Sequence, residues 1–586
     1  MNVKRIALSF LMMLPILCSY GQVKQLFEDY YKGLQPLFHE DATYNGDHRF
    51  DDQLDIEGAP LIEKRKQFFL SYQRRLQAID RNTLSESDRI SYDVLAFNLQ
   101  DMLEGIRLHT AYFPMTQFFS TALSMGQYGS GSSVQPFKTV EDYENWARRM
   151  SAFEEWTDTT IANFNHGIAI QMVLPKALVR KMIPQLEALA VRDPAKSIFY
   201  RPLHQFPASF SAADKKQLTA RYAAVINTQL LPSYDKLVAY LKDTYLAAAQ
   251  DHDGLSALPN GKALYEYYFR RFTTTRGLTP EALYQTGLQE VARITAEMEK
   301  VKTKTGFNGT LTEFFLFLKT DPQFRPFKTP EEVLQAYRDI YTKIKPHIND
   351  LFSHQPATAF EIKRVEAFRE ASQAGASYVP GNLKENRPGI FYVPVRDASQ
   401  VNVTFYGLEA TFIHEAVPGH HFQISLQQEN DQIPSFRKQP GFSVFTEGYA
   451  LYVESLGEQL GCYSDPYQKM GALNNELHRA IRLVTDIGIH TGKMTREEAI
   501  QYMLTHESIS EDIAIAETER YMAMPGQALS YKTGELKIKA LRAKYEKQLG
   551  DEFNQKAFHD ALLANGDMPL YVLEDYLDNW AAQGGK

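Results

Sequence analysis

The chain has 586 residues, of which 44% are hydrophobic and 23% charged, and its formal net charge is -8. This composition is that of a globular protein with ample apolar material for a core, which excludes an intrinsically disordered chain. Lys and Arg form no long run that could follow a phosphate backbone, so a nucleic acid is not the expected partner.

The N-terminus has the layout of a secretory signal. Two basic residues precede an apolar stretch at positions 6–17, and small residues follow. The apolar stretch is shorter than the roughly 20 residues of a membrane span, and no comparable stretch occurs later. We therefore expect residues 1–21 to be a signal peptide, the mature protein to be periplasmic or secreted, and no stable membrane span. Lipid attachment at Cys18 is disfavoured because Leu17 stands where a small residue normally precedes a lipidated Cys.

A helix start is predicted where Ser or Thr precedes an acidic residue by three positions, because the two side chains can hydrogen-bond the unpaired backbone amides of the helix N-terminus. They are Ser85 with Asp88, Thr329 with Glu332, Thr495 with Glu498, and the similar start Thr279-Pro280-Glu281. Residues 281–304 then place apolar side chains on one helical face. With no repeat or long linker, residues 22–586 are expected to form one large, mainly α-helical catalytic domain with few short strands.

The segment 377–397 differs from this helical pattern. Pro and Gly punctuate it, while the sequence Ile-Phe-Tyr-Val in its middle is rich in strand formers. We expect a short strand or an extended loop there. Tyr378, Arg387 and Tyr392 are candidates for lining a substrate cleft, and a packing role is equally compatible with their positions.

The stretch His-Glu-Ala-Val-Pro-Gly-His-His, which begins at His414, is the most informative in the chain. In zinc hydrolases a His followed directly by Glu supplies one metal ligand and a base that faces the metal-bound water. The second His of that pattern comes four residues after the first, on the next turn. Here that position is Pro418, so the second ligand has to be His420 or His421, with Glu415 as the base.

A regular helix could bring neither His beside His414. At about 100° per residue, His420 would diverge by about 120°, and His421 would lie about 10 Å along the axis. Pro418 lacks the amide hydrogen for the carbonyl of His414 and crowds it, and Gly419 permits an irregular turn. We infer a bulge that brings His420 beside His414, and His421 is the alternative second ligand.

A catalytic zinc site needs a third protein ligand. Glu447 begins a stretch of interior-type residues, Tyr449 to Leu456, where a carboxylate needs a partner such as a metal. Glu454 is the second choice. The predicted metal ligands are therefore His414, His420 and Glu447, holding one zinc ion per chain, within a segment of about 400–535.

Further candidates lie downstream. Asp486 and His490 are four residues apart, so the carboxylate could hold the imidazole tautomer and His490 could stabilise an oxyanion, unless they form a surface pair.

The stretch 520–534 also offers hydrogen-bond donors for a peptide carboxylate or an oxyanion, and Tyr531 is the preferred oxyanion donor. A purely structural role is the alternative for Arg520 and Gln527. The four candidates are Arg520, Tyr521, Gln527 and Tyr531.

The motifs HEAVPGHHFQ, TEGYALYVESLG, RLVTDIGIHTGKMTREEAI and MPGQALSYKTGELKI together resemble a bacterial family catalogued as domain of unknown function 885. That family is grouped with the gluzincin-type metallopeptidase clan, whose zinc ligands are two His and one Glu. The resemblance implies a mostly helical peptidase-like fold, a zinc ion, and the roles given above to His414, Glu415, His420 and Glu447. It implies no particular substrate.

These observations predict a zinc metallopeptidase in which Glu415 takes a proton from water that attacks a peptide carbonyl. A metal-dependent amidase or esterase would need the same groups. A catalytically silent peptide-binding protein is the alternative from another class, although a base beside the metal argues against it. A glycosidase has no defensible pair of carboxylates here.

Overall fold

The computed structural model describes residues 21–131, 133–365, 370, 375–382, 386–404 and 407–585. The predicted signal peptide, except its last residue, and Cys18 lie outside these ranges. The described chain is mainly α-helical with three short strands, which confirms the predicted fold class. No helix in these ranges combines the length and apolar character needed to cross a membrane.

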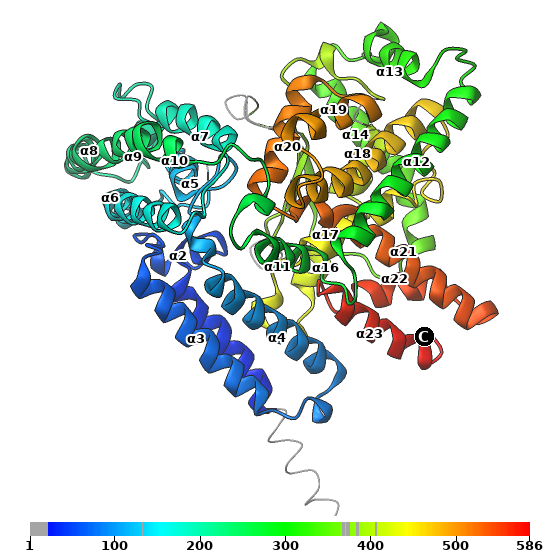
Figure 1. The fold of residues 1–586 in the computed structure, drawn as a ribbon, viewed down its shortest axis with the longest axis horizontal. Helices are drawn as coiled ribbons and strands as arrows, with labels where there is room; N and C mark the ends of the chain where they lie inside the picture. Colours follow the sequence, from blue (N-terminus) through cyan, green and yellow to red (C-terminus); the bar gives the residue numbers. More distant parts are fainter. Residues whose placement is uncertain are drawn as a thin grey trace, which may run out of the picture.

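The first half of the chain forms an N-terminal group of helices, with residues 21–34 also helical. Trp146, Phe153 and Tyr234 are buried in a core largely its own, and in Figure 1 α5 to α10 lie together on one side. The group comprises α2 (His39–Tyr44), α3 (Ala59–Gln77), α4 (Glu86–Arg107), α5 (Thr121–Tyr128), α6 (Val140–Ala169), α7 (Lys176–Leu189), α8 (Ala212–Val225), α9 (Leu231–Tyr240) and α10 (Leu246–Ala248).

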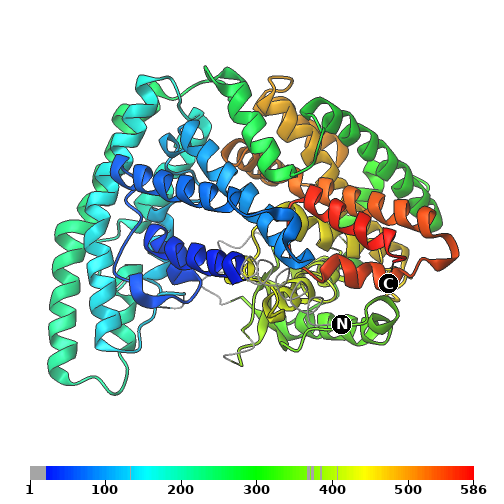
Figure 2. The same ribbon diagram turned by 90° about the horizontal axis from the view of Figure 1, so that it is seen from below.

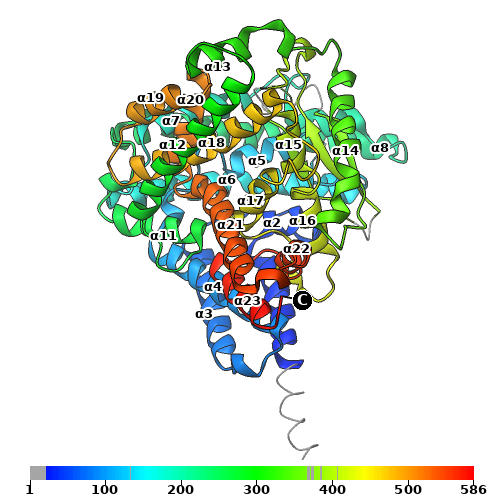
Figure 3. The same ribbon diagram turned by 90° about the vertical axis from the view of Figure 1, so that its right-hand side faces the viewer.

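The second half forms a larger C-terminal group. Helices α12 and α18 lie along each other, as do α17 and α21 (Figures 1 and 3). Figure 2 shows α4 reaching α23, so the two groups are in contact. The helices are α11 (Gly261–Thr273), α12 (Pro280–Lys304), α13 (Leu311–Thr320), α14 (Pro330–Leu351), α15 (Leu408–Glu415), α16 (His420–Glu429), α17 (Ser443–Glu454), α18 (Pro466–His490), α19 (Arg496–His506), α20 (Glu511–Ala523), α21 (Ser530–Leu549), α22 (Gln555–Leu563) and α23 (Leu570–Ala582).

The predicted helix starts are confirmed. Thr329 and Thr495 form capping boxes with their acidic partners at the heads of α14 and α19. Ser85 caps α4 and Thr279 caps α12 by accepting a hydrogen bond from a first-turn amide. Each cap satisfies backbone donors that have no partner within the helix, so these starts could be found from local sequence alone.

A three-stranded sheet lies between α14 and α15 in the sequence. Its strands are β1 (Phe360–Arg364), β2 (Ser377–Val379) and β3 (Gly389–Val393), in the order β1-β3-β2. β3 pairs in parallel with β1 and antiparallel with β2. The central strand contains the predicted Ile-Phe-Tyr-Val sequence, with Phe391 fully buried against the C-terminal core.

One close helix crossing, between α17 and α21, locates the elements around the candidate site. A Cβ atom on Gly534 of α21 would lie 2.0 Å from the carbonyl oxygen of Val444 of α17. A Cβ on Gly448 of α17 would lie 2.4 Å from the Cα of Gly534. Only glycine permits this approach, which places the backbone beside Glu447 against α21, one turn from Tyr531.

Candidate metal centre

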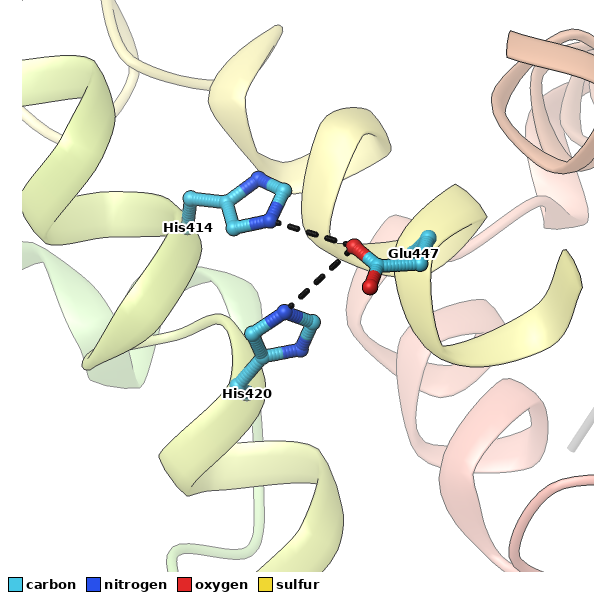
Figure 4. Close-up of side chains that lie close together, drawn as sticks. All are labelled: His414, His420 and Glu447. Carbon is cyan, nitrogen blue, oxygen red and sulfur yellow. Dashed lines mark ion pairs between the residues drawn. The ribbon is translucent and has the colours of Figure 1, made fainter. Parts of the chain in front are cut away.

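Three predicted ligands come together in the C-terminal group. His414 lies at the end of α15, His420 begins α16, and Glu447 lies in α17. One ligand atom from each lies within 4.8 Å of the others. Oε2 of Glu447 is 3.4 Å from Nε2 of His414 and 3.5 Å from Nε2 of His420, and Figure 4 shows both rings directed at this carboxylate. Two imidazoles and one carboxylate match the donor set of a catalytic zinc site.

The interruption of the helix before His420 brings the two histidines together. α15 ends at Glu415 and α16 begins at His420, so the two histidines belong to different helices. A Cβ on Gly419 would lie 1.9 Å from the carbonyl oxygen of His414, which explains the glycine. The hydroxyl of Tyr449 donates to the carbonyl of Pro418 at 2.9 Å and fixes the turn to α17. The expected interruption is present, as an end and a new start of helix rather than a bulge.

His421, the reserve candidate, is directed elsewhere. Its Nδ1 lies 2.9 Å from the hydroxyl of Tyr378 in β2 and 3.3 Å from that of Ser425. Burial lowers the pKa of His421 to about 4, so the ring is neutral at physiological pH. Tyr378 therefore belongs to the packing around His421.

Glu454 orients His414 instead of joining the donor set. Its Oε1 lies 2.7 Å from Nδ1 of His414, on the side of the ring opposite the atom facing Glu447. Glu454 follows Glu447 by seven positions, two helical turns, so one face of α17 carries both carboxylates. A carboxylate behind a ligating His fixes the tautomer and strengthens the ligand. The seven-residue spacing of the two glutamates was the feature of the sequence that could have indicated this orienting role.

We expect Glu454→Gln to weaken zinc binding by about 10- to 100-fold, because a ligating His loses its orienting carboxylate. Competition with a chromogenic chelator measures the affinity. Glu458→Gln is the matched control, since Glu458 is exposed and pairs with Lys469. Equal affinities for the Glu454 variant and the wild type would contradict the orienting role.

The charged groups of the cluster shift one another's ionisation. Burial lowers the pKa of His414, but its interactions with Glu447 and Glu454 prevail and raise that pKa to about 10. Burial raises the pKa of Glu447, yet the nearby His420 and His414 hold it well below its usual range. Glu447 is thus an anion, and a metal would compete with a proton on His414, so its affinity should rise with pH.

Glu415 lies beside the cluster but outside the donor set. Burial raises its pKa, and the charges of His420 and His414 oppose this shift. A half-buried carboxyl with a raised pKa, next to the ligands, has the properties of a general base.

The predicted pairing of Asp486 with His490 is wrong. Asp486 accepts hydrogen bonds from the hydroxyl of Tyr265 at 2.8 Å and from the amide of Gly526 at 2.9 Å. His490 accepts from the amide of Leu255 at 3.3 Å, and its Nε2 bonds the carbonyl of Tyr521 at 2.9 Å. With both ring nitrogens bonded to the backbone, His490 has a structural role.

The predicted donors around Tyr531 form one hydrogen-bonded group. Nη2 of Arg520 lies 2.9 Å from Oε1 of Gln527 and 3.3 Å from the hydroxyl of Tyr531. Nε2 of Gln527 reaches the hydroxyl of Ser443 at 3.4 Å, one turn before Glu447. Tyr521 is buried and donates to Glu517 at 2.9 Å. Arg520, Gln527 and Tyr531 thus stay candidates, and Tyr521 supports Glu517.

The remaining candidates lie in and around the sheet. Arg387 is exposed and donates to the carbonyl of Pro380 at 2.9 Å, while Tyr392 is half-buried in β3. Neither belongs to the group formed by His414, His420 and Glu447.

A cavity of about 1020 Å³ lies between the two groups of helices. Its walls come from both, and they include Tyr112, His166, Tyr268, Arg271, His490 and Gln527. Gln527 also belongs to the group around Tyr531, whereas His414, His420 and Glu447 do not line the cavity.

Two solved structures from bacteria share this fold. A protein of Colwellia psychrerythraea, described as a "putative lipoprotein", is 25% identical, with a TM-score of 0.88 over 96% of this chain and 100% of its own. A Shewanella oneidensis protein, described as a "putative lipoprotein of unknown function", is 19% identical, with a TM-score of 0.73 over 94% and 99%. No curated protein matches the chain. The family described as "Bacterial protein of unknown function (DUF885)" matches residues 40–577, and the chain belongs to that family.

Proposed function

We propose that the protein is a zinc-dependent peptidase of the gluzincin type. The observation that carries this proposal is the convergence of His414, His420 and Glu447 from three helices, with ligand atoms within 4.8 Å. Glu454 behind one ligand and Glu415 beside the set add the orienting group and the base that a purely structural metal site does not need.

The reaction would add water across a peptide bond, giving the hydroxyl to the acyl carbon and the hydrogen to the amine. A zinc ion held by the three ligands would lower the pKa of bound water and polarise the carbonyl. Glu415 accepts the proton from the attacking water and delivers it to the leaving nitrogen. Tyr531, positioned by Arg520, donates a hydrogen bond to the developing oxyanion.

A peptide is the substrate that the surroundings support. The cavity beside Gln527 has the size of a site for a small ligand or a short peptide, and it lies between two packed groups of helices. The lipoprotein descriptions of the two similar structures support export of this chain. Mass spectrometry of the mature N-terminus would separate cleavage near Gly21 from lipid attachment at Cys18.

Elemental analysis of the purified mature protein tests the metal site. We expect about one zinc ion per chain in the wild type, and its loss in both His420→Ala and Glu447→Ala, because each variant removes one of three protein ligands. His421→Asn is the matched control and should keep the metal, since His421 faces Tyr378.

A wild-type protein that carries no metal and takes up none from added zinc would overturn the hydrolase proposal. The hypothesis of a catalytically silent binding protein would then replace it.

A further inference from the structure

Two arginines contact Tyr531, the proposed oxyanion donor, and a third arginine lies on the same helical face as one of them. Arg479 and Arg482 are three residues apart on α18, so they share one helical face. The guanidinium of Arg482 lies 4.6 Å from the centre of the Tyr531 ring, and Nη2 of Arg520 lies 3.3 Å from the Tyr531 hydroxyl. The charge of Arg479 acts on Glu415. The face therefore extends from the proposed base to the proposed oxyanion donor.

Among the described residues, a single carboxylate lies within ion-pair distance of these arginines. Glu517 is the shared anion, with its oxygens 2.8 Å from Nη2 of Arg482 and 3.4 Å from Nη1 of Arg520. His478 contacts the same carboxylate at 3.3 Å. Arg479 hydrogen-bonds only Asn475 on its own helix, and it pairs with no carboxylate within the ranges that the structure describes. One carboxylate thus serves two arginines, while a third has none.

Three donor atoms on Arg479 and Arg482 lack a hydrogen-bond partner among the described residues. Nε of Arg479 and both Nε and Nη1 of Arg482 are buried, and none makes a well-aligned hydrogen bond to a described atom. Arg482 is only 5% exposed. A buried donor without a partner, and above all one on a cation, costs free energy unless a ligand supplies the acceptor. An anion that binds beside Arg479 would supply the acceptor that its Nε lacks.

The planar guanidinium pairs best with a carboxylate, which it can bind through two parallel hydrogen bonds. A peptide offers such a group at its C-terminus or on an Asp or Glu side chain. Because the arginine face lies between Glu415 and Tyr531, the carboxylate has to be close to the bond that is cut. Every linear peptide carries a C-terminal carboxylate, whereas an acidic side chain depends on the sequence, which favours the terminus.

We infer that Arg479 and Arg520 bind the C-terminal carboxylate of a peptide substrate, so that the protein removes residues from C-terminal ends. This inference rests on the proposed peptidase function. Arg520, whose side chain is 21% exposed, and half-buried Arg479 are the groups within reach of a ligand. Arg482 is a positioning residue that stacks on Tyr531 and anchors Glu517.

Three blocked tripeptides test the inference with the zinc-loaded wild type. They are acetyl-Ala-Ala-Ala with a free carboxylate, its C-terminal amide, and the amide of acetyl-Ala-Ala-Glu. We expect kcat/KM for the free acid to exceed that for both amides by about 30-fold or more, the effect of losing one partner of a buried charge pair. Equal rates for acid and amide would overturn the inference. A Glu amide cut as fast as the free acid would assign the arginines to a side-chain carboxylate and also overturn it.

Arg479→Gln should reduce the ratio of the free-acid rate to the amide rate toward one. Arg338→Gln is the matched control and should keep the wild-type ratio, because the side chain of Arg338 on α14 is 41% exposed and pairs with Glu331. Arg479→Lys, which keeps the charge but loses the planar fork, should retain part of the preference. Circular dichroism establishes that each variant is folded. An unchanged ratio in folded Arg479→Gln contradicts the role of Arg479.

A binding measurement separates this inference from the proposed function. Titration calorimetry with Glu415→Gln protein compares the free acid with its amide in the absence of turnover. If the free acid binds more tightly than the amide but the wild type cleaves neither peptide, the carboxylate site is supported and the peptidase function is contradicted. Equal binding of the two peptides would overturn the carboxylate site whether or not the wild type cleaves them.

Discussion

Replacing Glu415 with Gln should lower kcat by about 10³-fold on any peptide that the wild type hydrolyses, while the zinc content stays at the wild-type level. Removal of a general base typically costs 10²- to 10⁴-fold. The metal should stay because Glu415 lies outside the donor set of His414, His420 and Glu447. Steady-state kinetics and elemental analysis on the same preparation measure both quantities.

The pH profile adds a second readout for Glu415. Because burial raises its pKa, the acid limb of kcat/KM should lie above the ordinary carboxyl range, and activity should fall as the pH decreases through that limb. The limb should disappear in Glu415→Gln. Glu331→Gln, an exposed change on α14, is the control. Full activity in folded Glu415→Gln would exclude Glu415 as the base.

Substitution of Gly534 by Ala should destabilise the protein and weaken zinc binding together. The new methyl group would meet the carbonyl oxygen of Val444 at 2.0 Å, and a backbone atom inside α17 cannot move aside as a flexible side chain can. Overpacking of this kind costs roughly 1–3 kcal/mol or more. Relief requires α17 to separate from α21, and Glu447 lies on α17 next to the crossing.

Chemical denaturation measures the free energy of unfolding, and chelator competition measures the zinc affinity. Ala543→Met is the control on α21, because Ala543 is exposed and the larger side chain projects into solvent. A stable Gly534→Ala protein with wild-type zinc affinity would show that the crossing does not position Glu447.

Local sequence was sufficient for much of the fold. Caps such as Thr329 with Glu332 act within a single turn, so their pattern predicts the start of α14 without knowledge of the tertiary structure. The strand 389–393 was likewise visible from strand formers between Pro and Gly. The parallel pairing of β3 with β1 could not be predicted, since the segment of β1 carried no comparable signal.

The candidate site was predictable to the extent that its signals lie close together in sequence. Pro418 and Gly419 indicated the interruption that separates His414 from His420, and interior-type residues after Glu447 indicated a carboxylate in need of a partner. The pairing of Asp486 with His490 failed because residues far away in the chain, Tyr265 and Leu255, supply their partners. Helical spacing allows a contact, but tertiary packing decides between competing partners.

The arginine face was missed for the same reason. Arg479 and Arg482 have the spacing of countless surface residues, and their significance depends on Tyr531 and Glu517, which come from α21 and α20. A helical period identifies which residues share a face, but it does not identify what that face meets.

The end of one helix at Glu415 and the start of another at His420 also affect how relatives of this protein can be detected. A search of genomes for a second histidine four positions after the first would pass over this chain, although the donor atoms of His414, His420 and Glu447 lie within 4.8 Å of one another. Such chains would be retrieved by a pattern that accepts Pro-Gly before the second histidine and places that histidine six positions after the first. The pattern would also require two glutamates, seven positions apart, further downstream. Sequence surveys that rely on the shorter spacing therefore undercount proteins able to assemble this donor set.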